Sequence, residues 1–228
     1  MGDLFPVVEA IYSVTRIQTE SGSEGTGFVV RYGSNYVLVT AAHGVPNETR
    51  VEFLLSRFDL IGTDRVSAER VDDPDMSSED DIALFRLQNW PLSPILTTDR
   101  LCAEGIRFGE EVLLLGFPTG LAFASEMGGS AVTTPMVKRG VLATMDFPTA
   151  NGSPRFYIDL VANPGFSGSP VLFRHAVSGE IRVAGMVLQT ATMKVPAGDE
   201  LIGASAYADL SLAVSVSRIR EHIEQSFA

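Results

Sequence analysis

Short β-rich runs, each followed by turn-forming residues, recur along nearly the whole chain. The 21 Gly and 12 Pro are spread among these runs rather than gathered in one tract. Many short strands with frequent turns are typical of barrels or of a sandwich, so we predict an all-β protein. The expected strands lie within Val7–Ile17, Gly27–Val30, Tyr36–Thr40, Val51–Leu55, Ile82–Leu87, Val112–Leu115, Val137–Ala143, Phe156–Val161, Val171–Phe173 and Val183–Leu188.

The end of the chain has a different pattern. Ile219, Ile223 and Phe227 recur at intervals of four with charged residues between them, and Ser217 precedes them at an N-cap position. This spacing predicts a short C-terminal helix. The 228 residues are enough for one large domain, and Asn89–Leu101, which contains two prolines, is the expected connection between its halves.

Composition limits the partners that the chain can bind. Its 28 Asp and Glu outnumber its 17 Lys and Arg, which gives a net charge of −11 and argues against nucleic acid or an anionic membrane as a partner. Cys102 is the only cysteine, so no intrachain disulfide can form, and we expect it to be a small, at least half-buried residue. We expect no metal or other cofactor. The first residues do not resemble a secretion signal, and no apolar run is long enough to span a membrane, so we expect a cytoplasmic protein.

Several polar segments have an ordinary explanation. The run from Asp72 to Asp81 is rich in carboxylates but does not have the spacing of an EF-hand, so we predict a solvated loop. His175 and His222 belong to no motif, and we expect both at the surface. The weakly charged stretch Leu121–Met136 fits either a mobile loop near a site or an ordinary connection.

Three residue types needed for acyl transfer stand in suggestive contexts. Ser167 lies between glycines that allow a tight turn, although such a string alone more often marks a structural turn. His43 directly follows a β-rich run, where a core or turn histidine is equally expected. Asp81 stands at the start of an apolar strand, where a carboxylate could orient a histidine or simply end an acidic loop.

The order of these motifs resembles a known family. Thr-Ala-Ala-His ending at His43, Asp-Ile-Ala-Leu beginning at Asp81 and Gly-x-Ser-Gly-Ser-Pro around Ser167 are similar to the motifs of trypsin-like serine peptidases. Gly-Thr-Gly-Phe at 25–28, Gly-Phe-Pro-Thr-Gly at 116–120 and Asn-Pro-Gly before Phe166 more particularly resemble the HtrA-type and glutamyl-endopeptidase-like branches, here without a PDZ domain.

The resemblance implies a fold and a set of roles. The fold would be two six-stranded antiparallel β-barrels of the chymotrypsin type in a single domain, 1–228, with barrels at about 1–95 and 96–214 and a helix at about 215–227. His43 would be the general base, Asp81 its orienting partner and Ser167 the nucleophile, while the amides of Gly165 and Ser167 would form the oxyanion hole. Asp80 and Ser169 compete with their neighbours for these roles, and the family motif favours Asp81 and Ser167.

The same resemblance bears on substrates and on activation. Phe166 replaces the aspartate that pairs with a new N-terminus in digestive relatives, which argues against activation by that route. The primary pocket would be lined by Val161, Ala162, Leu188, Gln189 and Thr190. Val161 stands where trypsin has its pocket aspartate, so apolar or small substrate side chains are expected.

The expected function is that of a serine endopeptidase that acts on protein or peptide substrates, and two other functions compete with it. An α/β-hydrolase places its serine before its acid and histidine, which is the reverse of the order found here. A binding or scaffolding protein that has this fold and a collapsed oxyanion hole would retain the same motifs, so it stays open as the alternative. The oligomeric state leaves no mark in the sequence.

Overall fold

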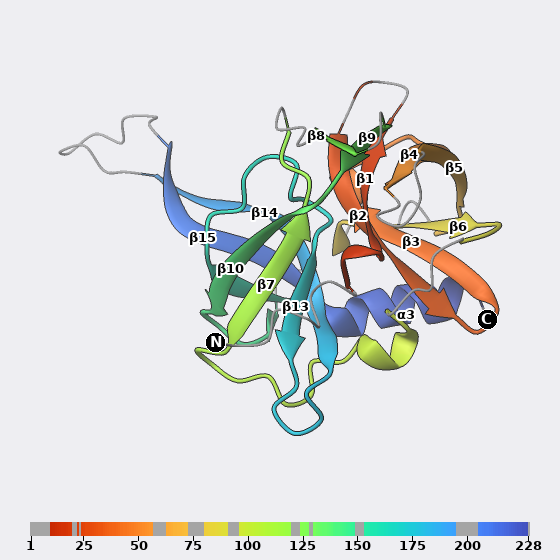
Figure 1. Cartoon of the computed structure of the whole chain (residues 1–228). Coiled ribbons are helices and arrows are strands. Elements are labelled where there is room, and N and C mark those ends of the chain that lie inside the picture. Colours follow the sequence, from red (N-terminus) through yellow and green to blue (C-terminus); the bar gives the residue numbers. More distant parts are fainter. Residues whose placement is uncertain are drawn as a thin grey trace.

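The computed structural model describes residues 10–19, 22, 24–56, 63–72, 80–90, 96–119, 124–127, 130–148, 153–194 and 205–227. These residues form two closed antiparallel β-barrels and a C-terminal helix (Figure 1). The all-β prediction and the six-stranded double barrel implied by the resemblance are confirmed. The expected strands are present, although the first begins only at Val14, because Ala10 and Ile11 are helical and 7–9 lie outside the described residues. Two strands that had not been predicted, β5 and β15, complete the barrels.

The first barrel closes in the order β1-β2-β3-β6-β5-β4. Adjacent strands are antiparallel, and β3 pairs with β6 so that Ala41 lies opposite Ile82. This register brings the end of β3 next to the start of β6. The strands are β1 (Val14–Gln18), β2 (Glu24–Tyr32), β3 (Asn35–Ala41), β4 (Arg50–Ser56), β5 (Thr63–Arg70) and β6 (Ile82–Leu87).

The second barrel follows the order β10-β7-β13-β14-β15-β12 and is closed by pairing between β10 and β12. A short strand, β11 (Phe147–Pro148), adds to β12, and β8 (Ala124–Met127) with β9 (Ser130–Thr133) forms a hairpin inside Leu121–Met136, the stretch expected to be either a mobile loop or an ordinary connection. The barrel strands are β7 (Glu111–Gly116), β10 (Met136–Leu142), β12 (Pro154–Asp159), β13 (Pro170–Arg174), β14 (Ile181–Lys194) and β15 (Ser205–Ser215).

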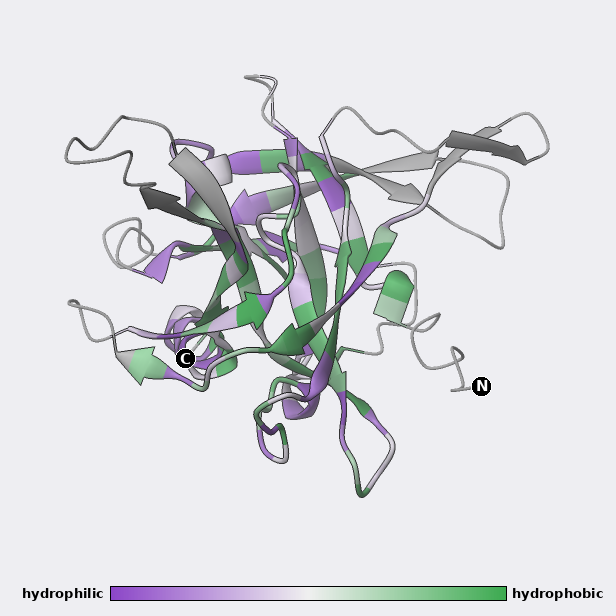
Figure 2. Cartoon of the chain, turned by 90° about the vertical axis from the view of Figure 1, so that its left-hand side faces the viewer, coloured by the Kyte–Doolittle hydropathy of each residue, from purple (hydrophilic) through white to green (hydrophobic). Residues whose placement is uncertain are grey.

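Hydrophobic side chains fill three clusters, one inside each barrel and one between the barrels. Val29 and Leu38 point into the first barrel, whereas their neighbours Phe28, Val30 and Val39 point toward the second barrel. Because both faces of these strands are buried, they carry continuous apolar runs rather than alternating ones. Hydrophobic residues accordingly lie mainly on strands that cross the middle of the molecule (Figure 2).

The C-terminal helix α3 spans Val216–Ser226 and packs where the barrels meet (Figure 1). Val216, Ile219 and Ile223 are buried in the cluster between the barrels. Its N-cap is Ser215, so the expectation that Ser217 caps the helix was wrong. Ser215 ends β15, and the strand therefore passes into the helix without a loop.

Thr26 on β2 links the two barrels through polar contacts. Its hydroxyl donates to the carbonyl oxygen of Gly165 at 2.7 Å and accepts from the amide of Phe117 at 2.9 Å. Its own amide donates to the carbonyl oxygen of Ser167 at 3.1 Å. Thr26 has no exposed surface, so one side chain satisfies two buried backbone groups of the other barrel.

We expect Thr26→Val to lower the free energy of unfolding by about 1–3 kcal/mol, because the isosteric change leaves the buried amide of Phe117 without its acceptor. Denaturant unfolding at neutral pH measures the change. Thr15→Val is the matched control, since Thr15 is also buried and its hydroxyl has no acceptor among the described residues other than its neighbour's carbonyl, at 3.5 Å. Equal losses in both variants would contradict a specific linking role for Thr26.

Candidate active site

His43 lies directly after β3, in the one-turn 3₁₀ helix η1 (Ala42–Gly44). The small residue Ala42 before it is buried, while His43 itself is exposed. The amide of Ala42 donates to the carbonyl oxygen of Asp81 at 3.1 Å, which continues the pairing of β3 with β6 beyond the strand ends. The imidazole is therefore held at the rim of the first barrel.

Asp81 binds His43 with both of its carboxylate oxygens. Oδ1 accepts from the backbone amide of His43 at 2.8 Å, and Oδ2 lies 2.7 Å from Nδ1 of the ring. Asp81 has a φ of 60°, a left-handed conformation that is uncommon outside glycine but more accessible to Asp than to most residues. This two-point contact fixes the ring with Nδ1 toward Asp81, so Nε2 is on the opposite side of the ring.

The same contact changes the basicity of the histidine. The hydrogen bond to Asp81 raises the pKa of His43 above its ordinary value, burial opposes this effect, and the charge of Asp81 adds to the rise. His43 is therefore a stronger base than a free histidine.

Ser167 stands in the tight loop between β12 and β13. The amide of Phe166 donates to the carbonyl of Asn163 at 3.1 Å, and the amide of Ser169 donates to the carbonyl of Phe166 at 2.9 Å. Gly168 has a φ of 87°, and a Cβ at this position would lie 1.9 Å from the carbonyl oxygen of Thr26. The loop can pack this closely against the first barrel only with glycine there.

The peptide between Pro164 and Gly165 has a defined orientation. The carbonyl oxygen of Pro164 accepts from the amide of Thr119 at 2.8 Å. Because the N–H and C=O of a trans peptide point in opposite directions, the amide of Gly165 points away from Thr119. Among the described residues, neither this amide nor that of Ser167 donates to a backbone carbonyl.

The hydroxyl of Ser167 donates to the carbonyl oxygen of Leu188 at 2.7 Å. In the described part of the chain, no hydrogen bond joins Ser167 to His43. Both residues, together with Gly165, nevertheless border one cavity of about 490 Å³.

Ser167 also borders a second cavity, of about 280 Å³. Four of the five residues expected in the primary pocket, Val161, Ala162, Gln189 and Thr190, line it. The fifth, Leu188, does not line it, because its side chain is buried between the barrels. The remaining lining residues are Asn163, Pro164 and Val187.

Comparison with known proteins gives the family. The model of the trypsin-like peptidase domain matches residues 25–178. The chain belongs to this family of trypsin-like peptidases. A comparison with curated proteins gave no significant match.

Solved structures of trypsin-like peptidases have a similar fold at low identity. The MamO protease domain from Magnetospirillum magneticum is 17% identical, with a TM-score of 0.59 over 94% of this chain and 97% of its own. A serine endoprotease from Yersinia pestis is 16% identical, with a TM-score of 0.63 over 97% of this chain and 65% of its own. The HtrA-type protease AlgW with a tripeptide is 19% identical, with a TM-score of 0.62 over 96% of this chain and 62% of its own. This chain therefore spans less than two thirds of the length of the last two.

Two expectations about polar residues were wrong for this trypsin-like peptidase. His222 is buried on α3, with 2% of its surface exposed, rather than at the surface. Its Nε2 lies 2.7 Å from Asp80, which is itself buried. Asp72, at the other end of the run expected to be a solvated loop, is also buried and accepts from Arg70 and from the amide of Leu84. Residues 73–79 of that run lie outside the described part.

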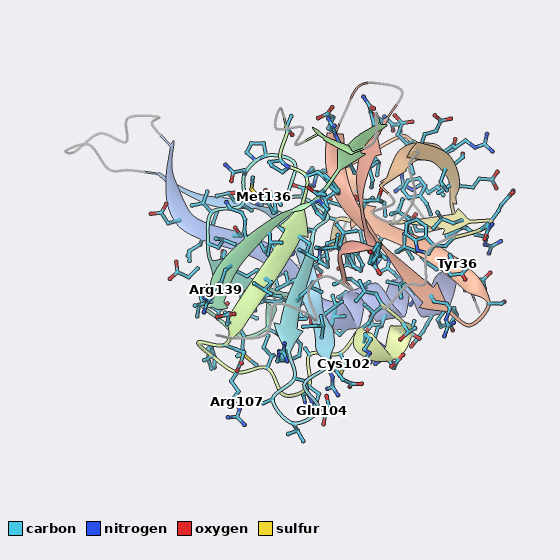
Figure 3. All side chains as sticks on the ribbon, in the orientation of Figure 1. Tyr36, Cys102, Glu104, Arg107, Met136 and Arg139 are labelled. Atoms are coloured by element: carbon cyan, nitrogen blue, oxygen red, sulfur yellow. The ribbon has the colours of Figure 1, made fainter. Side chains whose placement is uncertain are left out.

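The remaining candidates lie elsewhere in the peptidase domain. His175 is half-buried and contacts Ser178. Cys102 is half-buried, as expected, and lies with Glu104 and Arg107 along the lower edge of Figure 3. The described residues contain no group of three or more side chains that could hold a metal ion. No helix among the described residues is long and apolar enough to cross a membrane.

We expect Asp81→Asn to lower the pKa of His43 toward its ordinary value of about 6.5, because the amide removes the charge that stabilises the protonated ring. Since only the neutral ring can accept a proton, the acid limb of any activity that depends on His43 should move to lower pH. NMR titration of the His43 ring measures the shift, and the His175 signal in the same spectra is the internal control. An unchanged titration of His43 would contradict the assignment.

Proposed function

We propose that this trypsin-like peptidase is a serine endopeptidase that uses His43, Asp81 and Ser167. The observation that carries the proposal is the contact of Asp81 with both the backbone and the ring of His43, at the rim of a cavity that Ser167 also borders. A histidine held in one orientation by a carboxylate, beside a serine hydroxyl, is the arrangement needed for acyl transfer.

The first step begins with a rotation of Ser167 from Leu188 toward His43. Nε2 of His43 takes the hydroxyl proton as the Ser167 oxygen attacks the substrate carbonyl carbon. The resulting imidazolium is stabilised by Asp81 and then gives its proton to the leaving amine as the peptide bond breaks. A water molecule, deprotonated by the same nitrogen, hydrolyses the acyl-enzyme, and the proton returns to Ser167.

The amides of Gly165 and Ser167 are the proposed oxyanion donors. The hydrogen bond from the amide of Thr119 to the carbonyl of Pro164 supports this role. It points that carbonyl toward Thr119, so the Gly165 amide of the same peptide points away from Thr119. Gly165 borders the same cavity as Ser167 and His43. Donors held in advance where negative charge develops contribute a large part of catalysis in this class of reaction.

The second cavity is the proposed primary pocket for the substrate. Val161, Ala162, Pro164 and Val187 give it apolar walls. Lys138 lies beside this cavity and donates to the carbonyl of Val161 and to the side-chain oxygen of Asn163, the latter at 2.6 Å. Burial lowers the pKa of Lys138. Since its hydrogen bonds already go to the pocket wall, we propose that the pocket takes small or apolar side chains.

The alternative is a binding or scaffolding protein with this fold. It is favoured by one observation, that the Ser167 hydroxyl is bonded to Leu188 rather than to His43. In that case the serine would stay in this rotamer and no turnover would occur. The two functions differ in the reactivity of Ser167, which can be measured directly.

We expect wild-type protein to cleave casein and to react with a fluorophosphonate probe at neutral pH, and Ser167→Ala to do neither. Ser169→Ala is the matched control, because the Ser169 hydroxyl is buried two residues away and has no hydrogen-bond partner among the described residues. It should keep wild-type labelling. Absence of labelling and cleavage by the wild type would overturn the endopeptidase proposal in favour of the binding protein.

We expect cleavage of a mixed peptide library to occur mainly after Ala, Val and other small or apolar residues. The described residues that line the pocket include no carboxylate to pair with Lys or Arg at the cleaved bond. Mass spectrometry of the products identifies the cleavage sites, with Ser167→Ala as the blank. A preference for Asp or Glu would contradict the proposal and would indicate that Lys138 reaches the substrate.

A further inference from the structure

Asp80 and Asp81 are consecutive carboxylates that bind different histidines. Asp81 contacts His43, as described above. Asp80 turns the other way, and its Oδ2 contacts Nε2 of His222 at 2.7 Å and the guanidinium of Arg218 at 2.6 and 3.0 Å. The side chains of Asp80 and His222 are each only 2% exposed. One carboxylate therefore faces the proposed reacting groups, and its neighbour is anchored on α3.

The charge of Asp80 is well compensated in this buried position. Burial acts to raise the pKa of Asp80, but the hydrogen bonds that it accepts, the strongest of them from Arg218, and the charge of Arg218 outweigh this effect, so the pKa lies below its ordinary value. The contact with Asp80 likewise raises the pKa of Arg218. Asp80 is therefore ionised and bound on at least two sides, which is the condition under which a buried carboxylate stays in one place.

The anchor lies next to an unfavourable backbone conformation. Asp81 and Asp209 are the only described non-glycine residues with a positive φ. On the far side of Asp81, pairing of Ile82 with Ala41 holds the chain in the first barrel. On the near side, Asp80 is held by α3. A left-handed residue between two fixed points keeps its conformation because neither end can move to relieve it.

We propose that Asp80 is a positioning residue, which through Arg218 and His222 of α3 holds the turn that directs Asp81 at His43. The inference rests on the proposed function, since it assigns Asp80 a role in the same reaction. Asp80 itself touches no reacting atom. It acts by keeping the Asp81 carboxylate in the orientation that gives two bonds to His43.

Several titratable groups of the described residues face this arrangement. Asp80 faces Arg218 and His222 from α3, and Arg218 also binds Glu221 on the solvent side. His43 faces Asp81 at the start of β6, and Glu24 of β2 borders the same cavity. Loosening Asp81 would weaken the contact that raises the pKa of His43, so His43 would lose its proton at lower pH.

The test compares Asp80→Asn with wild type, using a peptide substrate and concentrations of active protein fixed by fluorophosphonate titration. We expect kcat to fall on the order of ten- to a hundredfold per titrated site, with KM little changed, because the orientation of the reacting groups is lost while the substrate pocket is not. The acid limb of the profile of kcat against pH should move to lower pH. If Asp80 had only a structural role, a smaller fraction of the protein would react with the fluorophosphonate, but kcat per reactive site and the acid limb of the pH profile would be unchanged. That result would overturn the proposal.

A pair of variants at His222 protects the test against misfolding of Asp80→Asn. His222→Gln keeps a side-chain N–H that can donate to Asp80 and should retain kcat and the pH profile, whereas His222→Leu removes the donor and should shift both. Glu221→Gln is the control, because Glu221 is half exposed and binds Arg218 without touching Asp80. Equal behaviour of the Gln and Leu variants at His222 would also overturn the proposal.

A second readout does not depend on turnover. The Nδ1 proton shared by His43 and Asp81 should give a low-field proton resonance in the wild type, and Asp80→Asn and His222→Leu should move or broaden it. If the wild type neither cleaves nor labels, the proposed function fails, and this resonance still tests the positioning of Asp81. A resonance that is the same in all variants would overturn the role of Asp80.

Discussion

Thr26 connects the two barrels through polar contacts of both its backbone and its hydroxyl. The side chain bonds to Gly165 and Phe117, and the backbone bonds to Ser167, so one residue of the first barrel holds two segments of the second, the loop of Gly165 and Ser167 and the end of β7. The carbonyl of Thr26 in turn accepts from the hydroxyl of Thr40 on β3 at 2.8 Å. Because hydrophobic packing is not directional, these bonds set the relative position of the strand that ends at the histidine and the loop that carries the serine.

Strand register brings the histidine and its carboxylate close together. Antiparallel pairing of Ala41 with Ile82 places the residues just beyond each strand end beside one another. This is why two residues that are 38 positions apart in the sequence can make two hydrogen bonds with each other. The serine reaches them differently, from the loop that leads into β13 in the other barrel, and its position is therefore sensitive to the contact between the barrels.

Local patterns predicted most of the strands, because both faces of the central strands are buried and their apolar runs are unbroken. β5 was missed because polar and charged residues surround Val66 and Ala68, so its sequence contains no apolar run. β15 was missed because small and polar residues such as Ser211, buried beside the proposed pocket, replace bulky ones. The motifs identified His43, Asp81 and Ser167 as candidates. No local signal places His222 against Asp80, since that contact joins residues that are far apart in the sequence.

Ion pairs with a buried carboxylate flank the His43–Asp81 contact on two sides. Arg70 binds buried Asp72 at 3.1 Å and also donates to the carbonyl oxygen of Val45, two residues after the histidine. Arg218 binds Asp80, one residue before the aspartate. Such pairs rarely increase stability over a well-packed apolar core, because removing two charges from water costs about as much as their attraction returns. Their directional bonds instead fix the position of the backbone at both ends of the contact, which apolar side chains at these positions would not do.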